Sequence, residues 1–164
     1  MAYEGICAPD GGITDSFRVA EPKTGAPAVQ ALRDAFAQEP RLTVKQDAAG
    51  LIRVVGGNVH TDLLDLRLPQ ITFHDEINPR DATESLDTYS EVRSYMQSHH
   101  IKFVNAMNAL APMPKGVHLN ATLKNVTISE ALDRITKSFP GVWIYGECVT
   151  PSGDRFVDFT FIEF

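Results

Sequence analysis

The stretch that decides the fold is residues 117–139, which read VHLNATLKNVTISEALDRITKSF. In its first part apolar side chains occupy alternate positions, namely Val117, Leu119, Ala121 and Leu123. This alternation predicts a strand with one apolar face and one face toward solvent. Thr127 is followed three positions later by Glu130, which is the capping-box pattern. In that pattern a hydroxyl and a carboxylate bond the free amides at a helix start. The stretch therefore predicts a strand that leads directly into a helix.

The residues after this helix predict a hairpin. Residues 142–149 and 155–164 have strand patterns, and Pro151-Ser152-Gly153-Asp154 between them is typical of a turn. An earlier part of the chain repeats the order, with a helix over 26–38 and strands over 41–47 and 51–55. The sequence thus contains two helix-plus-hairpin halves, residues 26–57 and 127–164.

A central strand and a long helix join these halves. We expect the strand within 63–74, with Pro69 at an edge or bulge because proline has no N–H to donate. A second capping box, Thr88-Tyr89-Ser90-Glu91, opens a helix that we expect to run to about Ala111. Residues 1–25, rich in glycine and proline, predict an N-terminal arm. The expected fold is one α+β domain over 26–164, with about three helices packed on a mixed or antiparallel sheet of five to seven strands.

One segment resembles a known family. The residues Leu119 to Ile135, LNATLKNVTISEALDRI, look like the secretin and TonB short N-terminal domain, and the likeness extends over about 117–162. That family has an alternating strand, an N-V-T/P-x-x-E-A-L step into a helix, and then a hairpin. The resemblance implies a periplasmic, non-catalytic module for protein–protein contact and signalling in the bacterial cell envelope. This chain departs from the family in the long segment that precedes the match.

Composition limits the function classes. The chain has 164 residues, 43% apolar and 22% charged, so it can bury a core. Its net charge of -6 and the absence of a basic run argue against nucleic-acid binding. No stretch approaches the roughly 20 apolar residues of a membrane span. The first residues do not resemble a signal peptide, so two alternatives stay open: a cytoplasmic protein, or an exported one whose leader is missing from this sequence.

The two cysteines leave two alternatives as well. Cys7 and Cys148 are too far apart in sequence to suggest a zinc site. In an oxidising compartment they can pair and tie the arm to a strand. Otherwise they are free thiols, with Cys148 buried and Cys7 exposed.

No motif of nucleophilic catalysis or phosphate binding is present, so we expect neither catalytic residues nor a cofactor. Two clusters offer carboxylates and imidazoles to a divalent metal, His60 with Asp62 and Asp65, and His74 with Asp75 and Glu76. Neither cluster has a recognised ligand spacing. The adjacent His99 and His100 point in different directions on a helix, so we expect one to be packed and the other solvated.

The C-terminal strands are rich in aromatic residues. Trp143 and Tyr145 share one strand face, and the other face is apolar too. Such a strand is either buried on both sides within the domain or meets a partner, which includes a second copy of the chain. The interface candidates are Trp143, Tyr145, Phe156 and Phe164.

Three functional hypotheses follow. The first is a non-enzymatic binding module that contacts another protein, and the family resemblance implies a place for it in the bacterial cell envelope. The second is a small metal-dependent hydrolase that uses the groups near residues 60–76. The third is a ligand-sensing domain with an apolar pocket between helix and sheet.

Overall fold

The computed structural model describes residues 1–8, 13–14, 26–46, 48, 50–104, 116–139 and 141–163. The helices within these residues are α1 (Ala28–Ala35), α2 (Pro79–Glu84), α3 (Ser90–Ser98), α4 (Ile128–Ser138) and the short 3-10 helix η1 (Ser85–Thr88). The strands are β1 (Ala2–Glu4), β2 (Ile6–Cys7), β3 (Ile13–Thr14), β4 (Leu42–Gln46), β5 (Ile52–Gly56), β6 (Arg67–Glu76), β7 (Ile101–Phe103), β8 (Leu119–Thr127), β9 (Gly141–Val149) and β10 (Arg155–Glu163). The expected α+β class is confirmed.

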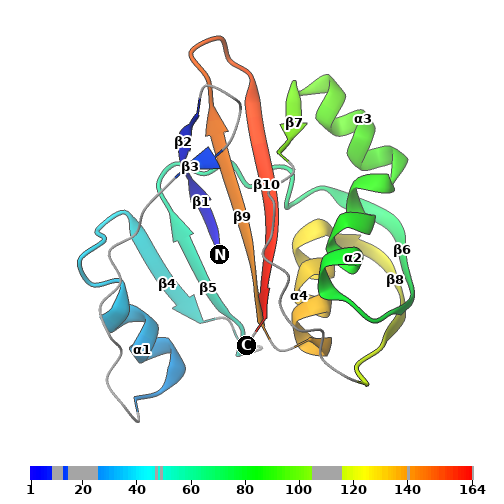
Figure 1. Cartoon of the computed structure of the whole chain (residues 1–164), viewed down its shortest axis with the longest axis horizontal. Helices are drawn as coiled ribbons and strands as arrows, with labels where there is room; N and C mark the ends of the chain where they lie inside the picture. Colours follow the sequence, from blue (N-terminus) through cyan, green and yellow to red (C-terminus); the bar gives the residue numbers. More distant parts are fainter. Residues whose placement is uncertain are drawn as a thin grey trace.

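The main sheet has six strands in the order β4-β5-β1-β9-β10-β7 (Figure 1). The pairs β4–β5 and β9–β10 are antiparallel hairpins, as the sequence predicts. Strand β1 lies between the hairpins and is parallel to both β5 and β9. The sequence predicts an arm at these first residues, because three residues are too few to show a periodicity. In the structure they join the two halves of the sheet.

Gly146 makes room for the aromatic side chain of this joining strand. Tyr3 of β1 lies opposite Gly56 of β5 and Gly146 of β9 in the strand register. A Cβ atom added at Gly146 would lie 3.1 Å from the Tyr3 hydroxyl oxygen and 3.2 Å from its Cζ, which is tighter than ordinary packing. The glycine therefore lets the aromatic ring lie flat across the neighbouring strand.

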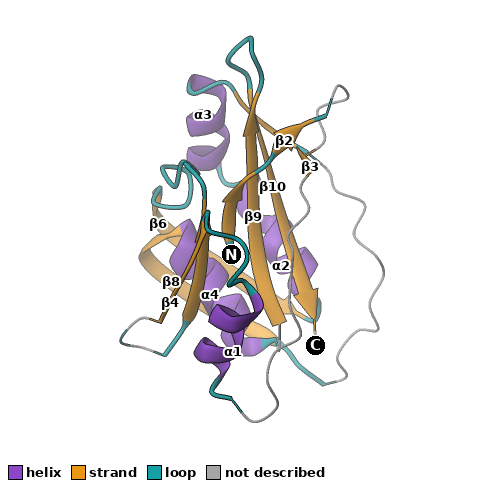
Figure 2. Cartoon of the chain, turned by 90° about the vertical axis from the view of Figure 1, so that its left-hand side faces the viewer, coloured by secondary structure: helices purple, strands orange, loops and turns teal. Residues whose placement is uncertain are grey.

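The core lies on one face of the main sheet. Helices α2 and α4 pack on this face, and the two-stranded ribbon β6–β8 covers them from the other side (Figure 1). The fully buried side chains come from all three layers, for example Phe73 of β6, Leu132 of α4 and Tyr145 of β9. On the opposite face the short ribbon β2–β3 lies against β9 and β10 (Figure 2). Within the described residues, no helix is long and apolar enough to cross a bilayer.

The ribbon β6–β8 confirms two expectations. Side chains on β8 alternate between inward positions and exposed ones such as Asn120 and Thr122. Pro69 of β6 lies where the ladder is interrupted, between the paired residues Leu68 and Gln70. Asn125 faces this gap and has a left-handed backbone with φ 52°. The proline therefore lies in a strand with a free edge, as its missing N–H requires.

The two predicted capping boxes differ in outcome. Thr127 and Glu130 form both bonds of the box at the start of α4. At α3 the N-cap is Tyr89, and its side chain makes no capping bond. The Thr88 hydroxyl instead donates to the carbonyl of Ser85 at 2.6 Å, because the 3-10 helix η1 precedes α3 directly.

The helix expected to reach Ala111 is shorter than the sequence indicates. Helix α3 ends at Ser98, and His100 takes a left-handed backbone with φ 52°. The chain then enters β7, which runs parallel to β10 and includes Phe103, a residue expected in the helical stripe. Residues 105–111 of the expected helix lie outside the described part of the chain.

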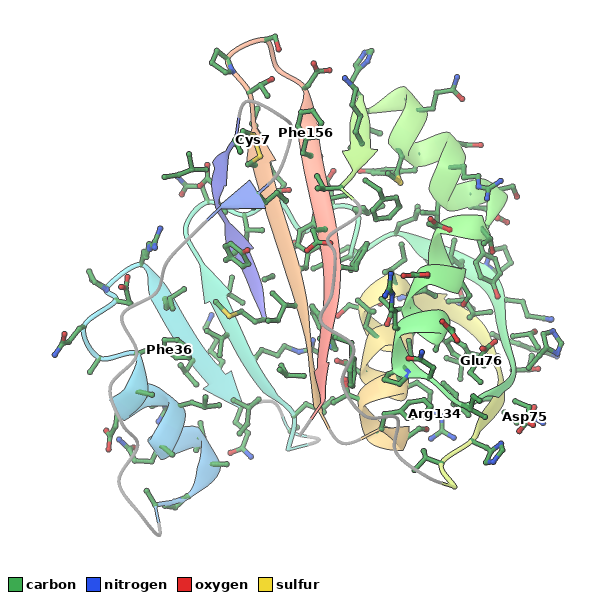
Figure 3. The ribbon with its side chains drawn as sticks, viewed as in Figure 1. Cys7, Phe36, Asp75, Glu76, Arg134 and Phe156 are labelled. Carbon is green, nitrogen blue, oxygen red and sulfur yellow. A yellow bond between two sulfur atoms is a disulfide. The ribbon has the colours of Figure 1, made fainter. Side chains whose placement is uncertain are left out.

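Cys7 and Cys148 form a disulfide with their Cα atoms 5.3 Å apart. Of the two alternatives for the cysteines, the structure has the paired one. Cys7 is in β2, directly after the joining strand, and Cys148 is a buried residue of β9 whose register partner is Phe156 of β10 (Figure 3). The bond therefore fixes the end of β1 to the strand beside it.

We expect reduction of this disulfide to lower the free energy of unfolding by about 2–4 kcal/mol. The two cysteines are 141 positions apart, so the bond removes a large part of the conformational freedom of the unfolded chain. Urea unfolding with and without reductant measures the difference. The double variant Cys7→Ser/Cys148→Ala is the control and should not respond to reductant. Equal stability of the oxidised and reduced protein would contradict this account.

Candidate functional site

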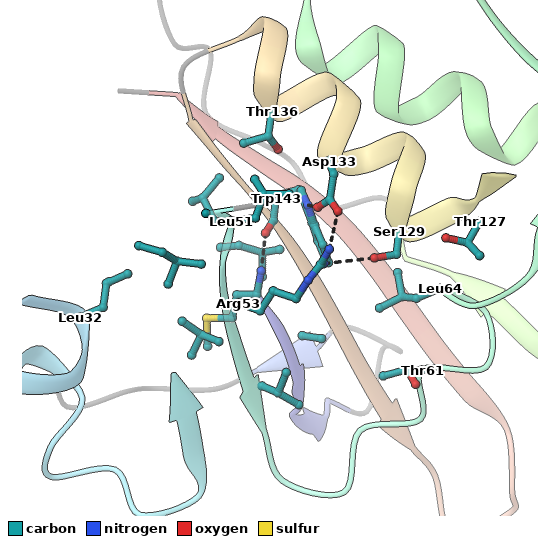
Figure 4. A pocket seen from close by; sticks show the side chains of 18 of the residues that line it. Leu32, Leu51, Arg53, Thr61, Leu64, Thr127, Ser129, Asp133, Thr136 and Trp143 are labelled. Carbon is teal, nitrogen blue, oxygen red and sulfur yellow. Dashed lines mark hydrogen bonds and ion pairs between the residues drawn. The ribbon is translucent and has the colours of Figure 1, made fainter. Parts of the chain in front are cut away.

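A pocket of about 840 Å³ lies over β5, β1 and β9, between α1 and α4 (Figure 4). Its wall includes Leu32 of α1 and Phe36 at the C-terminal cap of that helix, Ala2 of β1 and Trp143 of β9, together with Leu64 from the segment before β6. Most of the lining side chains are apolar. A volume of this size and a largely apolar wall are typical of sites that enclose small organic molecules.

Helix α4 supplies three of the polar side chains in the wall. Ser129, Asp133 and Thr136 are spaced by four and three positions, so they lie on the same face of the helix. All three line the pocket (Figure 4). The capping box fixes where the helix starts, and its first main-chain amides donate to carbonyls of the segment before β6, Ile128 to Leu66 and Ser129 to Leu64. Helix α4 and that segment are therefore held together at the pocket.

Arg53 of β5 reaches across the pocket to this face of α4. Its guanidinium forms an ion pair with the Asp133 carboxylate and donates to the Ser129 hydroxyl at 3.2 Å. The other Asp133 oxygen accepts from the Trp143 indole nitrogen at 3.1 Å. The Asp133 side chain is 12% exposed and that of Arg53 34%, so the pair lies in the pocket wall and not in open solvent. This arrangement orients Trp143, the single tryptophan of the chain.

A second polar network lies at the far end of β9. Glu147 is completely buried, and both of its carboxylate oxygens are occupied. Oε1 accepts from the main-chain nitrogen of His60 and contacts His60 Nδ1, each at 2.6 Å. Oε2 accepts from the Tyr145 hydroxyl at 3.1 Å and from Arg155 at 2.9 Å. Burial, followed by the charge of Glu147, raises the pKa of Tyr145 well above its usual range.

Arg155 extends this network to Asp62. Its guanidinium donates to both Asp62 oxygens, at 2.8 and 2.9 Å, and Tyr95 donates to the same carboxylate at 2.8 Å. These bonds, the one from Arg155 above all, lower the pKa of Asp62 to about 2. The same pairing raises the pKa of Arg155. Arg155 Nε is the one buried side-chain nitrogen or oxygen in the described residues that lacks a partner.

The network positions the segment that forms one wall of the pocket. His60 and Asp62 are anchored to β9 and β10, and the residues that line the pocket, Thr61, Leu64 and Asp65, lie beside them in the chain. Thr61 also donates to the Asp65 carboxylate at 2.9 Å. The buried charges therefore hold this wall of the pocket against β9 and β10.

The sequence-predicted metal clusters are arranged differently from a metal site. Asp62 binds Arg155 and His60 binds Glu147, while Asp65 faces the pocket. In the second cluster Asp75 contacts His118 Nδ1 at 2.9 Å, and Asp75 and Glu76 lie at the outer end of β6 (Figure 3). His74, the third member, is exposed. Among the described residues, no three His, Cys, Asp or Glu side chains come together in an arrangement that could hold a metal ion.

His99 and His100 are both exposed, whereas the sequence predicted one of them to be packed. The helix ends at these residues, so there is no following turn to cover either ring. The His99 ring stacks on Tyr95 with centroids 4.1 Å apart. The stacked rings lie next to the Tyr95–Asp62 hydrogen bond, and neither ring lines the pocket.

The aromatic residues of β9 and β10 fall into two groups. Trp143 and Tyr145 are 8% and 0% exposed and belong to the core, so burial within the chain accounts for these two interface candidates. Phe156 is half-buried on the opposite face, with Lys102 Nζ 5.4 Å from its ring centre. Phe164 lies outside the described residues. Contact with another protein or a second copy of the chain stays a prediction.

Sequence reasoning missed both polar groups that shape the site. Glu147 follows Trp143 and Tyr145 on the same apolar strand face, and Arg53 interrupts the apolar strand β5. A single charge within an apolar strand face indicates a buried charge that needs a partner. That signal was present, but it does not identify Arg155 or Asp133 as the partner.

Comparisons of the chain with protein-family models, with curated proteins and with solved structures found no match.

The low pKa of Asp62 predicts a pH dependence of stability. A carboxylate whose pKa is lowered in the folded state stabilises the fold above its ordinary pKa, and this stabilisation is lost as the pH falls toward 2. We expect Asp62→Asn to be less stable than the native protein at pH 7, and the difference to shrink between about pH 4 and pH 2. Urea unfolding at several pH values measures it. Asp81→Asn, at an exposed position of α2, is the control, and a difference independent of pH would refute the assignment.

Proposed function

We propose that the protein is a non-catalytic binding module whose ligand places an apolar body in the pocket between α1 and α4. The observation that carries this proposal is the pocket itself, about 840 Å³ with a mostly apolar wall and one cluster of polar side chains. Burial of an apolar body there contributes about 25 cal/mol for each Å² removed from water, and the polar cluster orients the ligand. This joins the first and third hypotheses, binding without catalysis and an apolar pocket between helix and sheet.

The hydrolase hypothesis receives less support from the same residues. Its carboxylates and imidazoles would have to converge on one ion, but Asp62 is bonded to Arg155 and Glu147 to His60, Tyr145 and Arg155. The groups near 74–76 lie on a different element, β6. The geometry therefore favours binding over metal-dependent hydrolysis.

We further propose that the module works in an oxidising compartment such as the bacterial cell envelope. The disulfide between Cys7 and Cys148 supports this, because such bonds are rare in reducing compartments. The resemblance of residues 117–162 to the secretin and TonB short N-terminal domain points the same way. In the structure this stretch has the order strand, helix and hairpin in β8, α4, β9 and β10.

The pocket proposal is tested with the uncharged apolar dye Nile red. We expect the native protein to bind the dye, and Ala28→Phe and Thr136→Phe, which fill the pocket from α1 and from α4, to weaken binding about tenfold, a loss of about 1.4 kcal/mol. Ala37→Phe places the same side chain at an exposed position just beyond α1 and should bind normally. No binding by the native protein, or equal binding by all variants, would contradict the proposal.

The compartment proposal is tested on protein recovered from its native cells. We expect Cys7 and Cys148 to resist alkylation until a reductant is added, because the folded protein holds them as a disulfide. Intact mass spectrometry after alkylation gives the answer. Rapid alkylation of both thiols without reductant would place the protein in a reducing compartment.

A further inference from the structure

The charged side chains that line the pocket are one cation and two carboxylates. Arg53 comes from β5, Asp133 from α4, and Asp65 from the segment between β5 and β6. Arg53 and Asp133 neutralise each other in their ion pair. The Met1 amino group belongs to a lining residue too, but burial and the neighbouring Arg53 lower its pKa to about 5, so it carries little positive charge at pH 7. The charge left over is therefore negative and belongs to Asp65, an exposed residue that accepts a hydrogen bond from Thr61.

The wall disfavours an anionic ligand. An anion near Arg53 would lie beside the Asp133 carboxylate, which already neutralises this guanidinium. It would also face the Asp65 carboxylate in the same wall, so repulsion between like charges opposes its binding. A fatty-acid-like carboxylate should therefore be a poor ligand in spite of the apolar wall.

The wall favours a ligand that donates hydrogen bonds. An ionised carboxylate has about four acceptor positions. Asp133 uses one for Arg53 and one for Trp143 Nε1, and Asp65 uses one for the Thr61 hydroxyl. Both carboxylates thus keep acceptor capacity, and among the described residues no cation forms an ion pair with Asp65.

We propose that the pocket takes an amphiphilic amine, with the apolar chain against the wall and the protonated amine at Asp65. The amine supplies a positive charge to face Asp65 and N–H donors for its remaining acceptor positions. Its position at Asp65 follows from the charge distribution, because Asp133 is neutralised by Arg53 and Asp65 is not. This inference rests on the proposed pocket function and adds the chemical class of the ligand.

The test uses three probes with the same ten-carbon chain: decylamine, decanol and decanoate, each below the concentration at which it self-associates. Trp143 reports binding, because this single tryptophan lines the pocket. We expect decylamine to bind about tenfold more tightly than decanoate, with decanol between them, since opposite charges attract and like charges repel at the rim. The preference should weaken as salt is added.

Two variants show whether Asp65 is the group responsible. Asp65→Asn should reduce the preference for the amine to about threefold or less while decanol binding stays unchanged, because only the charge is removed. Glu84→Gln changes the net charge of the protein equally at an exposed position of α2 outside the pocket, and should keep the full preference.

The outcomes separate this inference from the pocket function. Decanoate binding as tightly as decylamine, or an unchanged preference in Asp65→Asn, would overturn the amine assignment and leave the pocket function standing. If none of the three probes alters Trp143 emission or displaces Nile red, the pocket function itself fails.

Discussion

The sheet depends on main-chain pairing of β1 with strands on both of its sides. Without these three residues the described hairpins β4–β5 and β9–β10 would share no hydrogen-bonded neighbour, because β1 alone connects them. The pocket depends on the same strand, since its floor is formed by β5, β1 and β9. The disulfide after β1 and the pairing of Tyr3 with Gly56 and Gly146 both favour this position. A short strand is thus held by covalent, steric and hydrogen-bonding constraints together.

Two systems of ion pairs connect the main sheet to the elements that form the walls of the pocket. Arg53 and Asp133 connect the sheet to α4 on one side of the pocket, while Glu147, Arg155 and Asp62 hold the segment on the other side. Buried ion pairs add little net stability, because the loss of hydration offsets the attraction between the charges. Their contribution here is geometric, since each pair permits one arrangement of the elements that it connects. The apolar wall supplies affinity, and these pairs define its shape and charge.

The sequence predicts the parts of this fold that depend on near neighbours. The alternation before residue 124, the capping box at Thr127 and both hairpins are local patterns, and the structure has all of them. Strand β1 could not be predicted, because its partners on β9 lie about 140 positions away and nothing in Ala2–Glu4 identifies them. The sequence does not predict the end of α3, because apolar residues at helical spacing continue through Phe103, which belongs to β7 in the structure. The pocket is formed by residues of several helices and strands and of the segment before β6, so no single stretch of sequence contains its pattern, although the isolated charges at Arg53 and Glu147 indicate that buried partners exist.

The interlocked bonds around Glu147 have a consequence for how such a chain can diverge. Asp62, Tyr95, Glu147 and Arg155 each share a hydrogen bond with at least one other member, and Glu147 has no exposure to water that could replace a lost partner. A substitution at one of these positions leaves a charge or a hydroxyl unmatched, whereas joint replacement by apolar residues of similar size does not. Descendants of one ancestral sequence should therefore keep the four residues as a set or exchange them together. Their covariation would then mark this fold among sequences whose other residues have diverged.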